Sequence, residues 1–298
     1  MPNLRDIRKR ISSVQSTKQI TRTMEMVASA KIRHAFDRVN AAQPYADCMS
    51  ETLANVAKHS SGSAHPLLSK HEEVKRVIVI AVTSDRGLAG GFNSNVLREF
   101  EHTLQAKAAE GAQVEAIACG KKAIAYFRYR KVEPLLSYVG LSADPTYDEA
   151  REIASFVSAR YEAEEVDEVV LIYNHAVNAA TQRLVNKPIL PIDTASFAGE
   201  VEGEEAEEAK LEGDYEFEPS AEEVLSQLLP AYVESTIFDA LLNSAAGEQG
   251  ARRKAMMAAT DNATEMLGAL NRLYNRVRQG AITTELNEIV GGAAALED

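Results

Sequence analysis

Residues 256–277 read MMAATDNATEMLGALNRLYNRV, and this stretch decides the fold. Its apolar side chains recur three and four residues apart, which is the spacing of a helix that turns one stripe toward a partner helix. A strand repeats every second residue and does not produce this spacing. The predicted seam consists of Met256, Ala259, Ala263, Met266, Leu270, Leu273 and Val277. Because no proline occurs after Pro230, we expect one helix of roughly 60 residues, about 90 Å long at about 1.5 Å per residue.

A second heptad pattern occupies the N-terminal part of the chain. Its members, spaced three or four residues apart, are Val14, Thr17, Thr21, Met24, Ala28, Ile32, Ala35, Val39, Ala42, Ala46, Met49, Leu53 and Val56. Two heptad segments at opposite ends of one chain predict an antiparallel coiled coil closed by an inserted domain. Many seam residues are small, so the two helix axes are expected to lie close together. Pro44 falls off the seam and predicts a bend rather than a helix end.

The segment between the heptads alternates strand and helix patterns. The β-branched run VKRVIVIAVTSD (74–85) is typical of a strand that is buried on both faces, and VEAIACG (114–120) of a second strand. Helices are expected from Asn93 or Ser94 to about Ala109, over KKAIAYFRYR, and from Asp144 or Thr146 to near Ala163. DEVVLIYNHAV (167–177) and TQRLVNKPILPI (181–192) predict an antiparallel hairpin at one edge of the sheet.

The predicted fold class is therefore α/β, with a long antiparallel two-helix coiled coil and an inserted, Rossmann-like domain whose sheet is mainly parallel. We expect four parts along the chain. They are an N-terminal coiled-coil helix (1–58), an α/β domain with its linker (59–197), an acidic surface loop (198–219) and a C-terminal coiled-coil helix (220–298).

The net charge of -12 is unevenly distributed. Residues 200–218 hold ten acidic residues and one lysine, whereas residues 1–40 hold nine Lys/Arg and three Asp/Glu. A basic helix in an acidic chain favours docking to acidic protein surfaces, with nucleic acid as the alternative partner. No DNA- or RNA-binding motif accompanies the basic helix, so we expect no nucleic-acid partner.

No stretch has the roughly 20 continuous apolar residues of a membrane span, and the N-terminus has no apolar signal core. Cys48 and Cys119 are isolated and predict reduced thiols.

Candidate catalytic or cofactor sites are weak in this sequence. GLAGG (87–91) follows a strand, as a phosphate-binding loop does, but it matches neither GxGxxG nor the P-loop pattern. A tight strand-to-helix turn explains these glycines better than nucleotide binding does. The six histidines are scattered, which argues against a metal site. We expect no catalytic residue, cofactor or metal, and keep a nucleotide-binding α/β protein with a coiled-coil adaptor arm as the alternative function.

Four segments carry a resemblance to a known family. ITTELNEIVGGAAAL (282–296) is very similar to the C-terminal signature of the γ subunits of F-type ATP synthases. IRKRISSVQSTKQITRTMEMVASAK near the N-terminus, TSDRGLAGGFN and AATDNATEM resemble the same family, in the same order along the chain.

The resemblance implies a non-catalytic central rotor shaft that couples ion flow through a membrane c-ring to conformational cycling of the catalytic β subunits. The implied partners are three α and three β subunits, an ε subunit and the c-ring, with no membrane span in the chain itself. It also implies a peripheral location at the cytoplasmic face of the bacterial inner membrane.

The resemblance also implies contact residues. Arg278, Gln279, Thr283 and Glu285 match positions that contact loops of β, and Met24 matches a position of the N-terminal helix that faces them. Met24 fits an ordinary seam position equally well. The foot near the c-ring and ε is implied, on a weaker match, to include Tyr215, Phe217 and Glu218.

Overall fold

The computed structural model describes residues 3–59, 65–71, 73–193, 218 and 220–297. The chain divides into two compact units, one of Met1–Ser29 with Arg252–Asp298 and the other of Ala30–Ala251. Two long helices, α1 (Leu4–His59) and α5 (Ala221–Glu297), contribute to both units. Both predicted terminal helices are therefore confirmed.

Neither long helix ends at its internal proline. α1 continues through Pro44, which is exposed, so the prediction that the helix does not end there is confirmed. α5 continues through Pro230 and begins just after Ser220, whose Oγ accepts a hydrogen bond from the backbone N–H of Glu223 (3.2 Å). A serine in this position satisfies one of the free N–H groups of the first turn.

The unit of residues 30–251 contains a five-stranded sheet with strand order β3-β2-β1-β4-β5. The strands are β1 (Arg76–Val82), β2 (Gln113–Cys119), β3 (Leu136–Tyr138), β4 (Glu168–Ala176) and β5 (Gln182–Leu190). All neighbours pair in parallel except β4 and β5, which form an antiparallel pair at one edge. The mainly parallel sheet and its edge hairpin are confirmed, whereas β3 was not predicted because three residues carry too little pattern.

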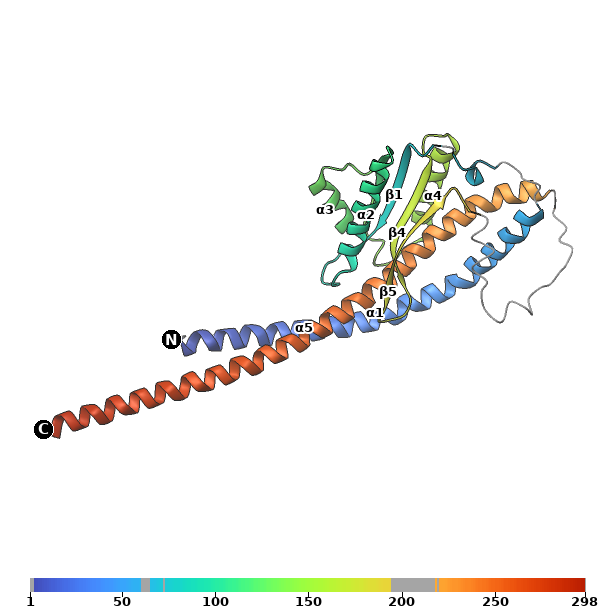
Figure 1. Cartoon of the computed structure of the whole chain (residues 1–298). Helices are drawn as coiled ribbons and strands as arrows, with labels where there is room; N and C mark the ends of the chain where they lie inside the picture. The colour runs from blue at the N-terminus through green and yellow to red at the C-terminus, as the bar shows by residue number, and fades with distance from the viewer. Residues whose placement is uncertain (1–2, 60–64, 72, 194–217, 219, 298) are drawn as a thin grey trace. The chain divides into compact units, whose positions relative to one another are not determined.

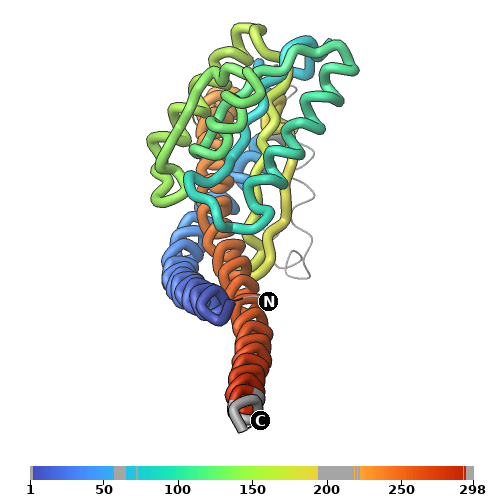
Figure 2. Tube along the Cα trace, turned by 90° about the vertical axis from the view of Figure 1, so that its left-hand side faces the viewer, coloured from blue at the N-terminus to red at the C-terminus, as the bar shows by residue number. Residues whose placement is uncertain are grey.

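Helices cover both faces of this sheet. They are α2 (Phe92–Ala109), α3 (Lys121–Arg130) and α4 (Tyr147–Glu162), with a short 3-10 helix, η1 (Pro66–Leu68), before β1. Side chains of α2 and α3, including Phe100 and Phe127, pack on one face against Val79 and Ala118. In Figure 1 these two helices lie on the opposite side of β1 from α4, and Figure 2 views the domain from the α2 and α3 side.

The other face packs against α4 and also against both long helices. Ile153 and Val157 of α4 share one buried cluster with Leu53 of α1 and with Leu229 and Val233 of α5. A smaller cluster joins Val39 of α1 to Leu242 and Ala246 of α5. The domain is therefore three layers deep, and its third layer includes the helices that lead to the two chain ends.

Two predicted helix starts have different outcomes. Thr146 precedes α4 and forms a capping box with Glu149, which confirms one of the two predicted caps. The prediction of Asn93 or Ser94 as the cap of α2 is wrong, because Gly91 holds that position. The Asn93 side chain instead hydrogen-bonds with Ser84 after β1, since its Oδ1 accepts from the Ser84 backbone N–H at 2.8 Å. Asn93 and Ser94 are the second and third residues of α2, so neither occupies the capping position.

In the unit formed by the two chain ends, α1 and α5 run antiparallel (Figure 1). Arg8 Nη2 donates to the Tyr274 hydroxyl at 2.7 Å, whereas Thr21 Oγ1 lies 2.8 Å from Thr260 Oγ1. As residue numbers rise along α1, those of its partner therefore fall along α5. The predicted antiparallel pairing of the terminal helices is confirmed.

Three predicted seam positions of α5 are wrong. Met266 and Leu273 are exposed by 53% and 36%, and Ala259 is only half-buried. Their C-terminal neighbours Thr260 and Leu267 are buried, and Tyr274 is half-buried. An α-helix turns about 100° per residue, so both registers keep spacings of three and four. The prediction chose the more apolar residue of each pair, and so preferred Ala259 to Thr260 and Leu273 to Tyr274. In the structure, Thr260 and Tyr274 form hydrogen bonds with side chains of α1.

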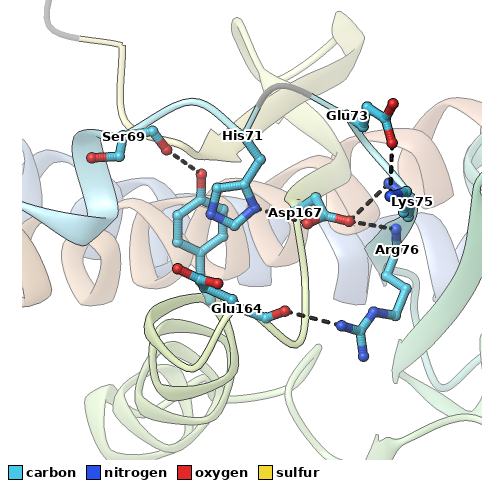
Figure 3. A network of polar contacts seen from close by, with 8 residues as sticks. Ser69, His71, Glu73, Lys75, Arg76, Glu164 and Asp167 are labelled. Carbon is cyan, nitrogen blue, oxygen red and sulfur yellow. Dashed lines mark hydrogen bonds and ion pairs between the residues drawn. The ribbon is translucent and has the colours of Figure 1, made fainter.

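The connector before β1 is held by a polar network around Asp167 (Figure 3). Asp167 Oδ2 accepts hydrogen bonds from the backbone N–H groups of Lys75 (2.8 Å) and Arg76 (2.7 Å), and Oδ1 lies 2.8 Å from His71 Nδ1. The His71 ring stacks on Tyr161 with centroids 4.9 Å apart. Burial alone would raise the pKa of Asp167, but the hydrogen bonds outweigh it and lower that pKa below its usual value.

We predict that Gly120→Ala strongly destabilises the α/β domain. Gly120 has φ +99°, and a Cβ at this position would lie 2.3 Å from the backbone oxygen of Thr83. Backbone strain and this clash together should lower the free energy of unfolding by about 3 kcal/mol or more. Urea unfolding followed by tyrosine fluorescence measures the change.

Gly111→Ala is the matched control, because Gly111 has φ +88° and no atom within 4 Å of its Cβ position. Strain alone should lower the free energy of unfolding by about 1 kcal/mol there. Equal losses in the two variants would show that the close approach to Thr83 has no effect.

We predict that Asp167→Asn destabilises the chain at pH 7 by about 1–3 kcal/mol, through loss of the charge-assisted hydrogen bonds. Because the folded-state pKa of Asp167 is lowered, its stabilisation is present above the unfolded-state pKa and is lost as pH falls through the folded-state value. The difference in unfolding free energy between the two proteins should therefore shrink below about pH 4. Asp148→Asn, at an exposed ion pair with Arg151, should change stability by less than about 0.5 kcal/mol. A difference for Asp167→Asn that stays constant from pH 7 to pH 3 would contradict the argument.

Candidate functional site

The last part of α5 presents an uncovered helical surface. Every residue from Arg278 to Val290 is exposed, whereas Met256, Ala263 and Leu267, earlier in the same helix, are buried against α1. The N-terminal end of α1 explains this change, because Arg8 already contacts Tyr274. In Figure 1, α5 continues beyond the first residues of α1. This stretch therefore offers all its side chains to another molecule.

The predicted contact residues of α5 share one side of this stretch. At about 100° per residue, Arg278 and Glu285 lie almost in line, and Gln279 and Thr283 form the adjacent row. Thr283 Oγ1 donates to the backbone oxygen of Gln279 at 2.9 Å, so its hydroxyl lies along the helix surface. The structure brings these four residues together on a face about 160° wide.

Four apolar residues that sequence reasoning missed complete this face. Ile282, Leu286, Ile289 and Val290 are exposed by 50%, 55%, 63% and 66%. We call the eight residues the α5 tip face; they are Arg278, Gln279, Ile282, Thr283, Glu285, Leu286, Ile289 and Val290. The signal was available in the sequence, since these apolar positions continue a helical stripe beyond Gly280. Apolar side chains flanked by charged and amide groups are typical of a protein-protein contact.

Met24 does not lie beside the α5 tip face. Thr21, less than one turn before Met24, contacts Thr260, which precedes Arg278 by 18 residues or about 27 Å of helix. Met24 is half-buried and lines a shallow concavity on α1 with Gln19, Ile20 and Thr23. It therefore belongs to a separate surface on the same pair of helices.

The predicted foot is largely outside the described residues. Tyr215 and Phe217 lie there, as does nearly all of the acidic stretch of residues 200–218. Glu218 is described and exposed.

Asp85, which lies just before the glycine loop, binds the start of α3 and the segment around Gly140 through its carboxylate. Asp85 Oδ1 accepts a hydrogen bond from the backbone N–H of Lys121, the first residue of α3, at 2.9 Å. Its Oδ2 accepts from the backbone N–H of Gly140 (2.9 Å) and the hydroxyl of Ser142 (3.1 Å). A phosphate bound at a helix N-terminus would need such donors. Here the chain's own carboxylate takes them, which speaks against nucleotide binding at this end of α3.

The loop itself is a tight turn, as the sequence allowed. Gly90 has φ +57°, a backbone conformation that favours glycine. Within the described ranges, no helix combines the length and apolarity that a bilayer crossing needs, and no group of three His, Cys, Asp or Glu side chains is arranged to hold a metal.

Comparisons with known proteins agree on one family. A family model described as ATP synthase matches residues 3–296. The ATP synthase gamma chain of Desulforamulus reducens is 46% identical over 297 residues, covering all of both chains. The ATP synthase gamma chain of Anaeromyxobacter sp. (strain K) is 44% identical over 300 residues, again covering all of both chains.

Solved structures show the same similarity. A chain from the central stalk and c-ring structure of the Tetrahymena thermophila mitochondrial ATP synthase matches with TM-score 0.57 and 26% identity, over 80% of this chain and 99% of that one. A chain from the Euglena gracilis mitochondrial OSCP/F1/c-ring structure matches with TM-score 0.63 and 20% identity, over 98% of this chain and 94% of that one. At 20% identity the second match shows the fold alone.

We predict that the buried Thr21–Thr260 pair is coupled. Thr21→Val alone removes the cross-seam hydrogen bond and should lower the free energy of unfolding by about 1 kcal/mol. Thr21→Val with Thr260→Val replaces both hydroxyls with methyl groups of similar shape and should be close to neutral. Thermal unfolding of wild type, both single variants and the double variant measures the coupling energy. Strictly additive losses would contradict a direct interaction between the two hydroxyls.

Proposed function

Because this chain belongs to the ATP synthase gamma chain family and is a central rotor stalk subunit, we propose that its α5 tip face contacts the catalytic β subunits of a bacterial ATP synthase. The paired helices serve as a shaft within a ring of three α and three β subunits. The contact residues are Arg278, Gln279, Thr283 and Glu285, with Met24 on its separate surface of α1. The chain itself is a non-catalytic component of the synthase.

One observation supports this proposal most directly. The α5 tip face leaves four large apolar side chains at least half exposed, beside an arginine, an amide and a carboxylate. Exposure of these apolar side chains to water is unfavourable, and a surrounding ring of protein subunits would bury them. Arg278 and Gln279 would then form directional hydrogen bonds with those subunits.

The proposed coupling is energetic. A shaft whose sides differ stabilises a different conformation of β at each rotational angle, and each β conformation in turn favours one angle. One charge crossing a potential of about 100 mV releases only about 2.3 kcal/mol, so several ion translocations must be combined for each ATP. A pair of helices with a tightly packed seam is stiff enough in torsion to hold that work between steps.

Each part of the chain has its own role in this proposal. Residues 1–58 and 220–298 form the shaft, residues 59–197 form the domain outside the ring, and residues 198–219 form an acidic surface loop. The ε subunit and the c-ring bind near the foot, where Tyr215, Phe217 and Glu218 are the candidate contacts. The subunit is peripheral, at the cytoplasmic face of the inner membrane.

We predict that Arg278→Ala lowers coupled ATP turnover by about tenfold, because it removes a charge-assisted hydrogen bond to β. Gln279→Ala should lower turnover less, by about threefold, because a neutral hydrogen bond contributes less. Both side chains are exposed, so the thermal stability of the isolated chain should not change. Turnover of the reconstituted complex and circular dichroism of the isolated chain measure the two effects.

Thr284→Ala is the matched control, since Thr284 is exposed on the side of α5 opposite the middle of the tip face. It should leave turnover unchanged. Wild-type turnover in both Arg278→Ala and Gln279→Ala would remove these residues from the contact, and failure of the chain to co-purify with α and β would refute the proposed function.

A further inference from the structure

The paired part of α1 and α5 also exposes apolar side chains, at a distance from the α5 tip face. Ile20, Met26 and Val27 of α1 are exposed by 60%, 59% and 51%, and Met257 of α5 is exposed by 48%. We call these four residues the apolar band. A single exposed apolar side chain is common on protein surfaces, whereas several at one place indicate contact with another molecule.

The apolar band occupies one short level of the helix pair. Thr21 and Thr260, whose hydroxyl oxygens lie 2.8 Å apart, show which residues of the two helices are at the same level. Met257 precedes Thr260 by three residues, so it lies about 4.5 Å along the antiparallel pair toward the C-terminal end of α1. Residues 20–27 span about 10 Å of α1. All four side chains therefore fall within about 10 Å along the axis of the pair.

The three band residues of α1 lie on two different sides of that helix. Ile20 directly precedes the buried seam residue Thr21, so it lies about 100° to one side of the seam. Val27 directly precedes the buried residue Ala28 and lies on the same side. Met26, two positions before Ala28, lies about 160° from the seam, where α1 faces away from α5.

Met257 occupies a third side of the pair. It directly follows the buried seam residue Met256, so it lies about 100° from the seam of α5. In an antiparallel pair, the residues that precede seam positions lie on one side of both helices, and those that follow them lie on the other. Met257 is therefore on the side opposite to Ile20 and Val27. At this level the pair exposes apolar side chains in three directions, whereas the α5 tip face covers one side.

We propose that the apolar band is enclosed by an apolar inner surface of the ring of α and β subunits. The inference rests on the proposed function, which places the helix pair within that ring. Only a partner that surrounds the pair covers apolar side chains in three directions at once. A second copy of this chain, a single partner helix or a flat lipid surface would cover one side and leave the others in water.

Methionine suits a contact whose partner surface changes as the helix pair turns. Its side chain is unbranched and flexible, so it re-packs against surfaces of different shape. Met24 adds a third methionine beside Met26 and Met257, and with Ile20 it lines the shallow concavity on α1. The apolar band thus provides contact without directional hydrogen bonds, which the α5 tip face provides.

Thiol labelling of the assembled complex tests this inference. Ile20→Cys and Met257→Cys each place one thiol on opposite sides of the pair, in a chain whose exposed Cys48 is replaced by alanine. Native Cys119 is buried, and burial raises the pKa of its thiol to about 12, so it does not react. We expect the maleimide labelling rate of both introduced thiols to fall by about tenfold or more on assembly with α and β, because labelling requires access to the thiol.

Tyr129→Cys is the matched control, because Tyr129 is 81% exposed on α3, in the domain that the proposed function leaves outside the ring. Its labelling rate should be the same in the isolated chain and in the complex. Equal slowing at all three positions would overturn the inference, because protection would not be specific to the apolar band.

An assembled complex in which Ile20→Cys or Met257→Cys labels as fast as in the isolated chain would also overturn the inference. The proposed function would then remain intact, since the chain would still have assembled. A chain that does not assemble with α and β would contradict the proposed function and this inference together.

Met26→Gln with Met257→Gln tests whether the enclosing surface is apolar. Amides that face an apolar surface lose their hydrogen bonds to water, so turnover of the complex should fall by about tenfold or more. Met26→Leu with Met257→Leu keeps both side chains apolar and should lower turnover by no more than about twofold. Equal turnover in the two double variants would contradict an apolar partner surface.

Discussion

The pairing of α1 with α5 is the interaction on which the rest of this structure depends. Its seam uses small and hydroxyl-bearing residues, such as Ala28, Ala263 and the Thr21–Thr260 pair, which allow a close approach of the two helices. Such a seam buries little apolar surface per layer, so its stability depends on continuity over many layers. Because the pairing joins the two ends of the chain, everything between them must fold as an insertion.

The inserted domain uses the same helices for its own core. Leu53 of α1 and Leu229 and Val233 of α5 are buried with sheet and α4 residues in one cluster. The backbone N–H of Ala176 in β4 also donates to Asn243 Oδ1 of α5 at 3.3 Å. Rotating the domain independently of these helix segments would therefore expose that cluster to water. The domain and these helix segments therefore share one hydrophobic core.

Much of this architecture could be predicted from the sequence, because periodicity reports directly on which side of an element is buried. The two seams, the parallel sheet and the β4–β5 hairpin all follow from spacing alone. The choice between Ala259 and Thr260 did not, because two registers fit and the hydroxyl of Thr260 finds its partner only across the seam. Asn93 was likewise predicted to cap a helix, because the sequence does not show that the fold brings Ser84 next to its side chain.

Less of the candidate site than of the fold could be predicted from the sequence. Arg278, Gln279, Thr283 and Glu285 came from family resemblance, although helical spacing alone could have placed them on one face with Ile282 and Leu286. That this face is uncovered could not be predicted, because it requires knowing that α1 ends its contact near Tyr274. The role of Asp85 could not be predicted from the sequence either. The groups that donate hydrogen bonds to its carboxylate belong to Lys121, Gly140 and Ser142, which are far from Asp85 in the chain.

We infer that the two terminal helices turn together as one shaft. The most direct measurement is ATP turnover of the assembled complex carrying Thr21→Cys with Thr260→Cys, in a chain whose exposed Cys48 is replaced by alanine. The hydroxyls of this pair lie 2.8 Å apart, so a disulfide should form readily on oxidation. We predict equal turnover in the oxidised and reduced complexes. Loss of turnover on oxidation that is restored by reductant would show that α1 and α5 must move apart, and would contradict rotation as one shaft.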